Sequence, residues 1–252
     1  MLTEPLEAVP RRATVVFLNS GSEPHVGSGR VWVEYARRLA VLGHRSVRTD
    51  FRGWGESPDD GHAPGRPYDP HCQEDTVTLV RALQERGHDR IVLVGLCAAA
   101  WTALRVVLTE PVAGIVALNP QFYWRQGDPV ESTLAETRTR RTAERLRDAK
   151  GGRWGWWSGL DLLGHRPWPA RWLDDLAASG VPIHLLFAEG DDGLEHLQDR
   201  LRRRLGRAQR RGTITLEVMA EVDHSMHRAW ARETVVAALR AQLDRLDAAQ
   251  VS

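Results

Sequence analysis

Apolar and polar positions along the chain follow two alternating patterns. Short segments rich in β-branched and other apolar residues predict strands, whereas the segments between them carry apolar residues three and four positions apart, as amphipathic helices do. The predicted strands cover residues 13–19, 45–50, 90–95, 112–119, 181–188 and 212–219. The predicted helices cover residues 30–42, 73–86, 98–108, 194–205 and 229–246.

This alternation predicts the fold class. A helix that connects two successive strands makes those strands parallel and covers a face of the sheet. We therefore expect an α/β fold with a mostly parallel, doubly wound sheet. The chain has 252 residues and is 42% hydrophobic, which is enough for one large domain of this kind.

The alternation stops between residues 120 and 179. This segment predicts a lid inserted into a core made of residues 1–119 and 180–252, and it holds six of the ten tryptophans among glycines and prolines that oppose a long helix. The rings either dock the insertion on the body or form the wall of an apolar substrate pocket. The candidates for the pocket are Trp124, Trp154, Trp156 and Trp157.

Charge and cysteine content narrow the classes of partner. Lys and Arg number 34 against 33 Asp and Glu, so the net charge of +1 favours a small-molecule partner over nucleic acid or membrane. The basic run at residues 200–211 predicts a solvated helix face, or a docking surface for an acidic acyl or peptidyl carrier protein. Two cysteines, Cys72 and Cys97, are too few for a disulfide framework or a zinc site, so we expect no metal and no cofactor.

The location of the protein is also predicted by the sequence. Residues 1–12 lack the apolar core of a signal peptide, and no apolar run approaches the length of a membrane span. A chain with so few cysteines is typical of a reducing compartment. We therefore expect a cytoplasmic protein.

The segment VGLCAAAW, residues 94–101, places Cys97 between an apolar strand and a helix. Cys97 is either a small buried side chain at a turn or a nucleophile displayed at a sharp strand-to-helix corner. Gly95 and Ala99, two residues away on either side, are small enough to let strand and helix approach closely. The first helical turn places partial positive charge and free N–H groups beside the sulfur, which favours the thiolate.

Three other segments support the nucleophile. TDFRGWGES, residues 49–57, resembles the D-x-R-G-x-G-x-S signature of α/β-hydrolases, while FAEGDDG (187–193) and VDHSMH (222–227) each follow a late strand. The order nucleophile, acid, histidine is that of the α/β-hydrolase triad. The chain therefore resembles the α/β-hydrolase superfamily over nearly all its length, in a variant with a cysteine nucleophile. The segments FLNSG (17–21), GSGR (27–30), GLC (95–97) and NPQFYW (119–124) also make it similar to small hydrolases associated with bacterial biosynthetic clusters.

The resemblance implies a catalytic role for three residues. Cys97 would attack an acyl carbon, and His224 would take the proton of Cys97 and later donate it to the leaving group. Asp191 would orient His224 and stabilise its charged form. Asp192 remains the alternative acid. The oxyanion hole would use the N–H of Ala98 and that of Ser20 or Gly21.

Several neighbouring residues carry weaker expectations. Asn19 stands where such hydrolases often have histidine, which departs from the family pattern. Asp50 and Arg52 are expected to hold the loop after their strand, and Cys72 is expected to be inert. Asp223 and His227 are expected to orient the loop of the predicted histidine, and His25 is a candidate for the substrate pocket.

The sequence thus predicts an enzyme that forms a thioester at Cys97. It would be an ester, thioester or amide hydrolase, or an acyltransferase, with a small apolar acyl substrate and a role in secondary metabolism. The alternative is a hydrolase-fold protein that binds, isomerises or cyclises a ligand without using Cys97 as a nucleophile. A cysteine engineered in place of serine would give the same sequence pattern.

Overall fold

The computed structural model describes residues 1–5, 12–20, 23–58, 61, 68–123, 168–226 and 228–248. Within these residues, seven strands form one sheet in the order β1-β3-β2-β4-β5-β6-β7. All neighbouring strands are parallel except β1 and β3, which confirms the predicted fold class. The strands are β1 (Leu2–Thr3), β2 (Thr14–Phe17), β3 (Ser46–Arg48), β4 (Ile91–Leu96), β5 (Gly114–Leu118), β6 (Ile183–Ala188) and β7 (Ile214–Met219).

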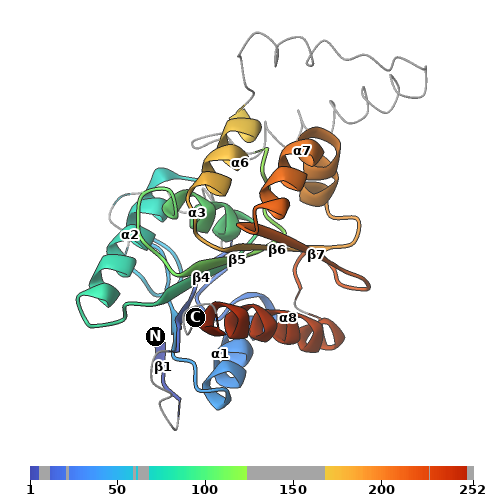
Figure 1. Ribbon diagram of the computed structural model, residues 1–252. Coiled ribbons are helices and arrows are strands. Elements are labelled where there is room, and N and C mark those ends of the chain that lie inside the picture. Colours follow the sequence, from blue (N-terminus) through green and yellow to red (C-terminus); the bar gives the residue numbers. More distant parts are fainter. Residues whose placement is uncertain are drawn as a thin grey trace, which may run out of the picture.

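Helices cover both faces of this sheet. Figure 1 shows α1 and α8 on one face and α2, α3, α6 and α7 on the other. No helix in the described part of the chain is both long enough and apolar enough to span a membrane. The helices are η1 (Ser28–Arg30), α1 (Val31–Val41), α2 (Pro70–Gln84), α3 (Ala98–Val106), α6 (Trp168–Ala178), α7 (Asp192–Arg210) and α8 (Ala229–Ala248).

Strand β4 lies in the middle of the sheet and is buried along its whole length. Its side chains alternate between two apolar clusters: Ile91 and Leu93 pack towards α2 and α3, and Val92 and Val94 pack towards α1 and α8. A strand covered on both faces needs apolar residues at every position, which explains the unbroken run in the sequence. The last residues of the strand are therefore held in a fixed position at the carboxyl end of the sheet.

Every predicted strand and helix is present, with shifted ends. Helix α2 begins three residues earlier than predicted because Pro70 fits the first helical position and the Asp69 carboxylate accepts a hydrogen bond from His71 N–H. Strand β1 and helix α6 were not predicted. Helix α6 lies within the predicted insertion, and its Trp172 is buried in the core.

The predicted insertion is described only at its two ends. Phe122 and Trp172, one near each end, are fully buried and their rings lie 5.3 Å apart. Residues 124–167, which include all four pocket tryptophans of the sequence prediction, lie outside the described residues. The predicted lid itself therefore remains a prediction.

Candidate active site

The corner between β4 and α3 holds Cys97 in an unusual backbone conformation. Its φ of 56° and ψ of −111° lie outside the regions that L-residues normally occupy, which costs on the order of 1–3 kcal/mol. Two hydrogen bonds hold the corner: Cys97 N–H donates to Leu118 O at 2.8 Å, and Trp101 N–H donates to Cys97 O at 3.1 Å. Strain of this kind at a strand-to-helix turn is what displays a nucleophile.

Gly95 makes the sharp corner possible. A Cβ at this position would lie 2.4 Å from the carbonyl carbon of Ala99 and 2.5 Å from the nitrogen of Ala100. Both contacts are with backbone atoms, which cannot rotate away. The close approach of β4 to α3 therefore requires glycine here, as the sequence predicted.

Asp191 caps α7 directly after β6. Its Oδ1 accepts hydrogen bonds from Gly193 N–H at 2.8 Å and from Gln121 Nε2 at 3.2 Å, while its Oδ2 lies 2.5 Å from His224 Nδ1. Asp191 is buried, whereas Asp192 is exposed as the first residue of α7. The geometry thus pairs His224 with Asp191.

The pKa of His224 is raised to about 10, first by the hydrogen bond with Asp191 and then by a hydrogen bond with Cys97, against the opposing effect of desolvation. The imidazolium is therefore the favoured form near neutral pH. Cys97, His224 and Asp191 all line one cavity, and His224 pairs with Asp191 within it.

Asn119 links the loops of the acid and the histidine. It is fully buried with φ of 46°, a conformation that asparagine tolerates better than most residues. Its Nδ2 donates to His224 O at 2.7 Å, and its Oδ1 accepts from Ala188 N–H at 2.8 Å. The sequence prediction missed this residue, although an asparagine at the end of a buried strand was the available signal.

Asp223 holds the loop of His224 from the other side. Its Oδ1 accepts from Ser225 Oγ at 2.9 Å and from Met226 N–H at 2.8 Å, and its Oδ2 lies 2.6 Å from Arg228 Nε. This is the orienting role expected for Asp223. His227 lies outside the described residues.

Asp50 joins two loops at the same end of the sheet. Its carboxylate accepts from Asn19 Nδ2 at 2.8 Å, from His25 N–H at 2.5 Å and from Glu56 N–H at 3.0 Å. The His25 ring also contacts this carboxylate through Nδ1 at 2.8 Å, and His25 is not among the described residues that line the cavity. The structure therefore places His25 in a loop-holding network and not against the cavity.

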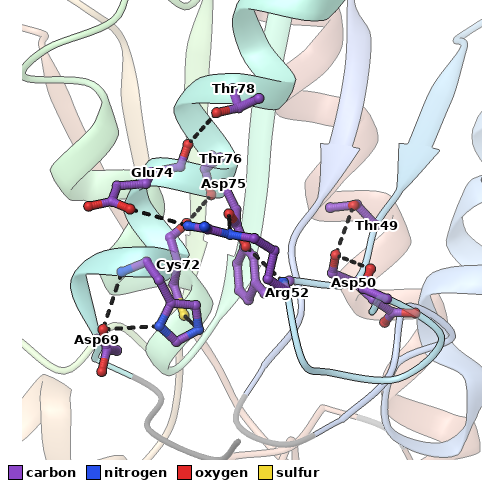
Figure 2. A network of polar contacts seen from close by, with 12 residues as sticks. Thr49, Asp50, Arg52, Asp69, Cys72, Glu74, Asp75, Thr76 and Thr78 are labelled. Atoms are coloured by element: carbon purple, nitrogen blue, oxygen red, sulfur yellow. Dashed lines mark hydrogen bonds and ion pairs between the residues drawn. The ribbon is translucent and has the colours of Figure 1, made fainter. Parts of the chain in front are cut away.

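Arg52 ties the same loop to helix α2. Figure 2 shows its guanidinium reaching Asp75 and Glu74, with Nε 2.5 Å from Asp75 Oδ1 and Nη2 3.2 Å from Glu74 Oε2. This agrees with the expected loop-holding role. Cys72 lies on the same helix, and burial raises the pKa of its thiol to about 12, which fits an inert cysteine.

A cavity of about 610 Å³ opens over Cys97. Ser20, Ala98, Asp191 and His224 contribute to its lining, so the structure brings these predicted site residues together. As the first residue of α3, Ala98 has an N–H without an intrahelical acceptor. Gly21 lies outside the described residues.

Tyr68, Gln121 and Tyr123 are among the cavity residues that were not predicted from the sequence. Tyr68 precedes α2 and places its hydroxyl 3.8 Å from Cys97 Sγ. Gln121 and Tyr123 follow β5, at the start of the predicted insertion. None of them belongs to a recognisable motif, so only the fold reveals that they lie beside the site.

The comparisons with known proteins agree with this architecture. The sequence model of the alpha/beta hydrolase family matches residues 15–238, and the chain belongs to this family. No curated protein matches it.

Among solved structures, the chain is similar to the proline iminopeptidase of Mycobacterium smegmatis, with 15% identity, a TM-score of 0.64, and coverage of 99% of this chain and 95% of that one. It is also similar to the monoacylglycerol lipase of Paleococcus ferrophilus, with 17% identity, a TM-score of 0.61, and coverage of 98% and 97%. A thermophilic esterase from Thermogutta terrifontis gives 17% identity, a TM-score of 0.62, and coverage of 98% and 93%. At these identities the likeness establishes the shared fold.

Proposed function

We propose that this protein is an acyl-processing enzyme that acts through a thioester at Cys97, as a hydrolase of esters, thioesters or amides or as an acyltransferase. The observation that carries the proposal is the strained Cys97 corner at the cavity, with His224 lining the same cavity and its Nδ1 lying 2.5 Å from Asp191 Oδ2. Membership of the alpha/beta hydrolase family supports a hydrolase.

In the first half of the reaction, Cys97 Sγ attacks the acyl carbonyl carbon. The new S–C bond forms as the bond from that carbon to the leaving oxygen, nitrogen or sulfur breaks, and His224 gives the leaving group a proton. Asp191 keeps the imidazole oriented and stabilises its charged form. The product is a thioester on Cys97.

In the second half, water or another acceptor attacks the thioester carbon. His224 takes the proton of the attacking O–H or N–H group, the S–C bond breaks, and the sulfur leaves as thiolate. Negative charge on the carbonyl oxygen would be stabilised by the N–H of Ala98 and by that of Ser20 or Gly21. The acceptor decides between hydrolysis and acyl transfer.

The substrate proposal is a small apolar acyl group. Trp32, Val31 and Leu96 provide apolar surface in the cavity, and the tryptophans of the insertion are proposed to add to it. Exposed Arg203, Arg207 and Arg210 on α7 support an acidic acyl or peptidyl carrier protein as partner. The resemblance to biosynthetic-cluster hydrolases supports a role in secondary metabolism.

The test exposes the intact protein to a panel of activated esters and acyl thioesters and then measures its mass. We expect an acyl adduct on Cys97, absent in the Cys97→Ala variant. Iodoacetamide at neutral pH should also label Cys97 well before buried Cys72. If both cysteines react equally and no acyl adduct forms, the alternative of a ligand-binding or isomerising protein is favoured.

A further inference from the structure

Tyr68 has a hydroxyl beside the proposed nucleophile. The two atoms, Tyr68 Oη and Cys97 Sγ, lie 3.8 Å apart, within hydrogen-bonding range for sulfur. Tyr68 lines the same cavity as Cys97 and is only 4% exposed. The two half-reactions proposed for Cys97 give this hydroxyl no role.

Aromatic packing fixes the position of the Tyr68 ring. The ring meets Trp101 of α3 edge to face, with centroids 5.5 Å apart and an interplanar angle of 88°. Trp101 in turn contacts Trp172 of α6 at 5.9 Å. A phenol held by fully buried rings keeps its hydroxyl in one place with little loss of side-chain entropy when it forms a hydrogen bond.

Either atom could donate in the contact between Tyr68 Oη and Cys97 Sγ, and a thiolate at Cys97 would leave the phenol O–H as the only donor of the two. Burial, followed by the nearby Cys97, raises the pKa of Tyr68 well above its ordinary value. The phenol is therefore neutral and keeps its proton over the working pH range. Its proton can be donated to a sulfur lone pair. A hydrogen bond to a charged acceptor is stronger than a hydrogen bond between two neutral groups.

We propose that Tyr68 is a further catalytic residue, whose hydroxyl donates a hydrogen bond to the Cys97 thiolate and holds it ready for attack. The inference rests on the proposed function, because it needs Cys97 to act as a thiolate. His224 supplies the charged partner of that thiolate, and Tyr68 supplies a neutral donor. Since the two donors act on the same atom, removal of one weakens but does not abolish reactivity.

The test compares the rate of Cys97 alkylation by iodoacetamide in wild type and Tyr68→Phe, across pH 5 to 10. Phenylalanine keeps the ring that packs on Trp101 and removes only the hydroxyl. We expect alkylation to slow by roughly tenfold at pH 6.5 and by much less at pH 9, since the lost donor matters most where the thiol must be held ionised.

The matched control is Thr76→Val, which removes another buried hydroxyl from the neighbouring helix. Thr76 Oγ1 donates to Cys72 O at 2.7 Å, away from the cavity lining. This variant should lose thermal stability but keep the wild-type alkylation profile. A second variant with 3-fluorotyrosine at position 68 retains the ring and is a stronger donor, so alkylation at pH 6.5 should become faster.

Two failures can be told apart. Slow, unselective labelling of Cys97 in the wild type would overturn the proposed function and this inference together. Fast wild-type labelling with an unchanged pH profile in both Tyr68 variants would overturn the role of Tyr68 alone. A parallel change in the Thr76→Val control would mean that the effect arises from packing, which would also overturn it.

Discussion

At the residue scale, the pairing of His224 with Asp191 rather than Asp192 depends on where β6 ends. Asp191 is the cap of α7 and points back towards the histidine loop, where Gly193 N–H and Gln121 help to fix its carboxylate. Asp192 is one residue further on and exposed. The start of α7 thus gives the two adjacent carboxylates different environments: Asp191 is buried as the N-cap, and Asp192 is exposed in the first helical turn.

This difference gives the first prediction. Asp191→Asn should lower kcat/KM by roughly 10²- to 10⁴-fold, because an amide cannot hold the imidazole in the same tautomer or stabilise its charge. Asn still caps a helix, so the fold should survive. Asp192→Asn is the matched control and should change kcat/KM by about twofold or less. The reverse ranking in a steady-state assay would assign the role to Asp192.

The raised pKa of His224 gives a prediction about stability. A histidine whose pKa is about 10 in the folded protein and about 6.5 when unfolded stabilises the fold fully below pH 6.5. That stabilisation is lost as the pH rises towards 10. The melting temperature of wild type should therefore exceed that of His224→Gln most at pH 6, and the gap should narrow towards pH 10.

Solvent limits the size of this effect, because the His224 side chain is 48% exposed and its charge is screened. The Asp191→Asn background serves as the control. Since the hydrogen bond with Asp191 is the largest cause of the raised pKa, the pH-dependent gap should shrink there. A gap that is unchanged in that background would assign the pH dependence to another group.

The sequence was sufficient to predict the three residues of the candidate triad, since each stands at a recognisable place after a strand. Cys97 is marked by small neighbours, and Asp191 and His224 by their order along the chain. Tyr68 and Asn119 could not be found in this way, because their roles depend on contacts across the fold. Asp192 could be set aside only once the start of α7 was known.

At the element scale, the junction of β4 and α3 decides whether Cys97 is displayed. The strand must turn within one residue, and the helix must return close to the strand backbone. Gly95 satisfies this requirement since its missing side chain leaves room for Ala99 and Ala100. The packing of β4 against α3 thus depends on the absence of a Cβ at position 95.

Gly95→Ala should therefore destabilise the protein by about 1–3 kcal/mol, the usual cost of overpacking, and reduce alkylation of Cys97. Gly206→Ala is the matched control. Gly206 lies inside α7, where an added Cβ meets only the flexible Arg210 side chain at 3.5 Å. This change should stabilise the fold by about 0.5–1 kcal/mol. Chemical denaturation of the two variants checks both signs, and equal effects would contradict the steric argument.

Most elements could be predicted from the sequence because their patterns are strong. Buried strands such as β4 give unbroken apolar runs, and α7 carries a clear apolar stripe. The two-residue strand β1 is too short to show a period. Helix α6 was not predicted, because it lies at the end of the predicted insertion, whose glycines and prolines oppose a long helix.

At the scale of the whole molecule, the tryptophans of the predicted insertion fall into two groups. One of its rings, Trp172, is an anchor, because it is fully buried between Trp101 and Phe122. This contact joins α6 to α3, the helix that starts directly after Cys97. Helix α6, which lies within the predicted insertion, is thus attached to the body at a position close to the candidate site.

The tryptophans of residues 154–157 are predicted to behave differently from this anchor. If they form a wall of the pocket, a longer apolar acyl chain gains about 25 cal/mol for each Å² removed from water against them. Trp154→Ala, Trp156→Ala or Trp157→Ala should then lower kcat/KM for a long acyl substrate far more than for a short one, with little change in melting temperature. We expect this for at least one of the three.

Trp172→Ala supplies the control for that experiment. Its ring is part of the core, so its loss should lower stability by about 3–5 kcal/mol and reduce activity on short and long substrates alike. Measuring kcat/KM on both substrates together with thermal stability therefore separates pocket rings from anchoring rings. If all three variants of residues 154–157 behave like Trp172→Ala, the insertion is only docked on the body and the acyl chain is selected elsewhere in the cavity.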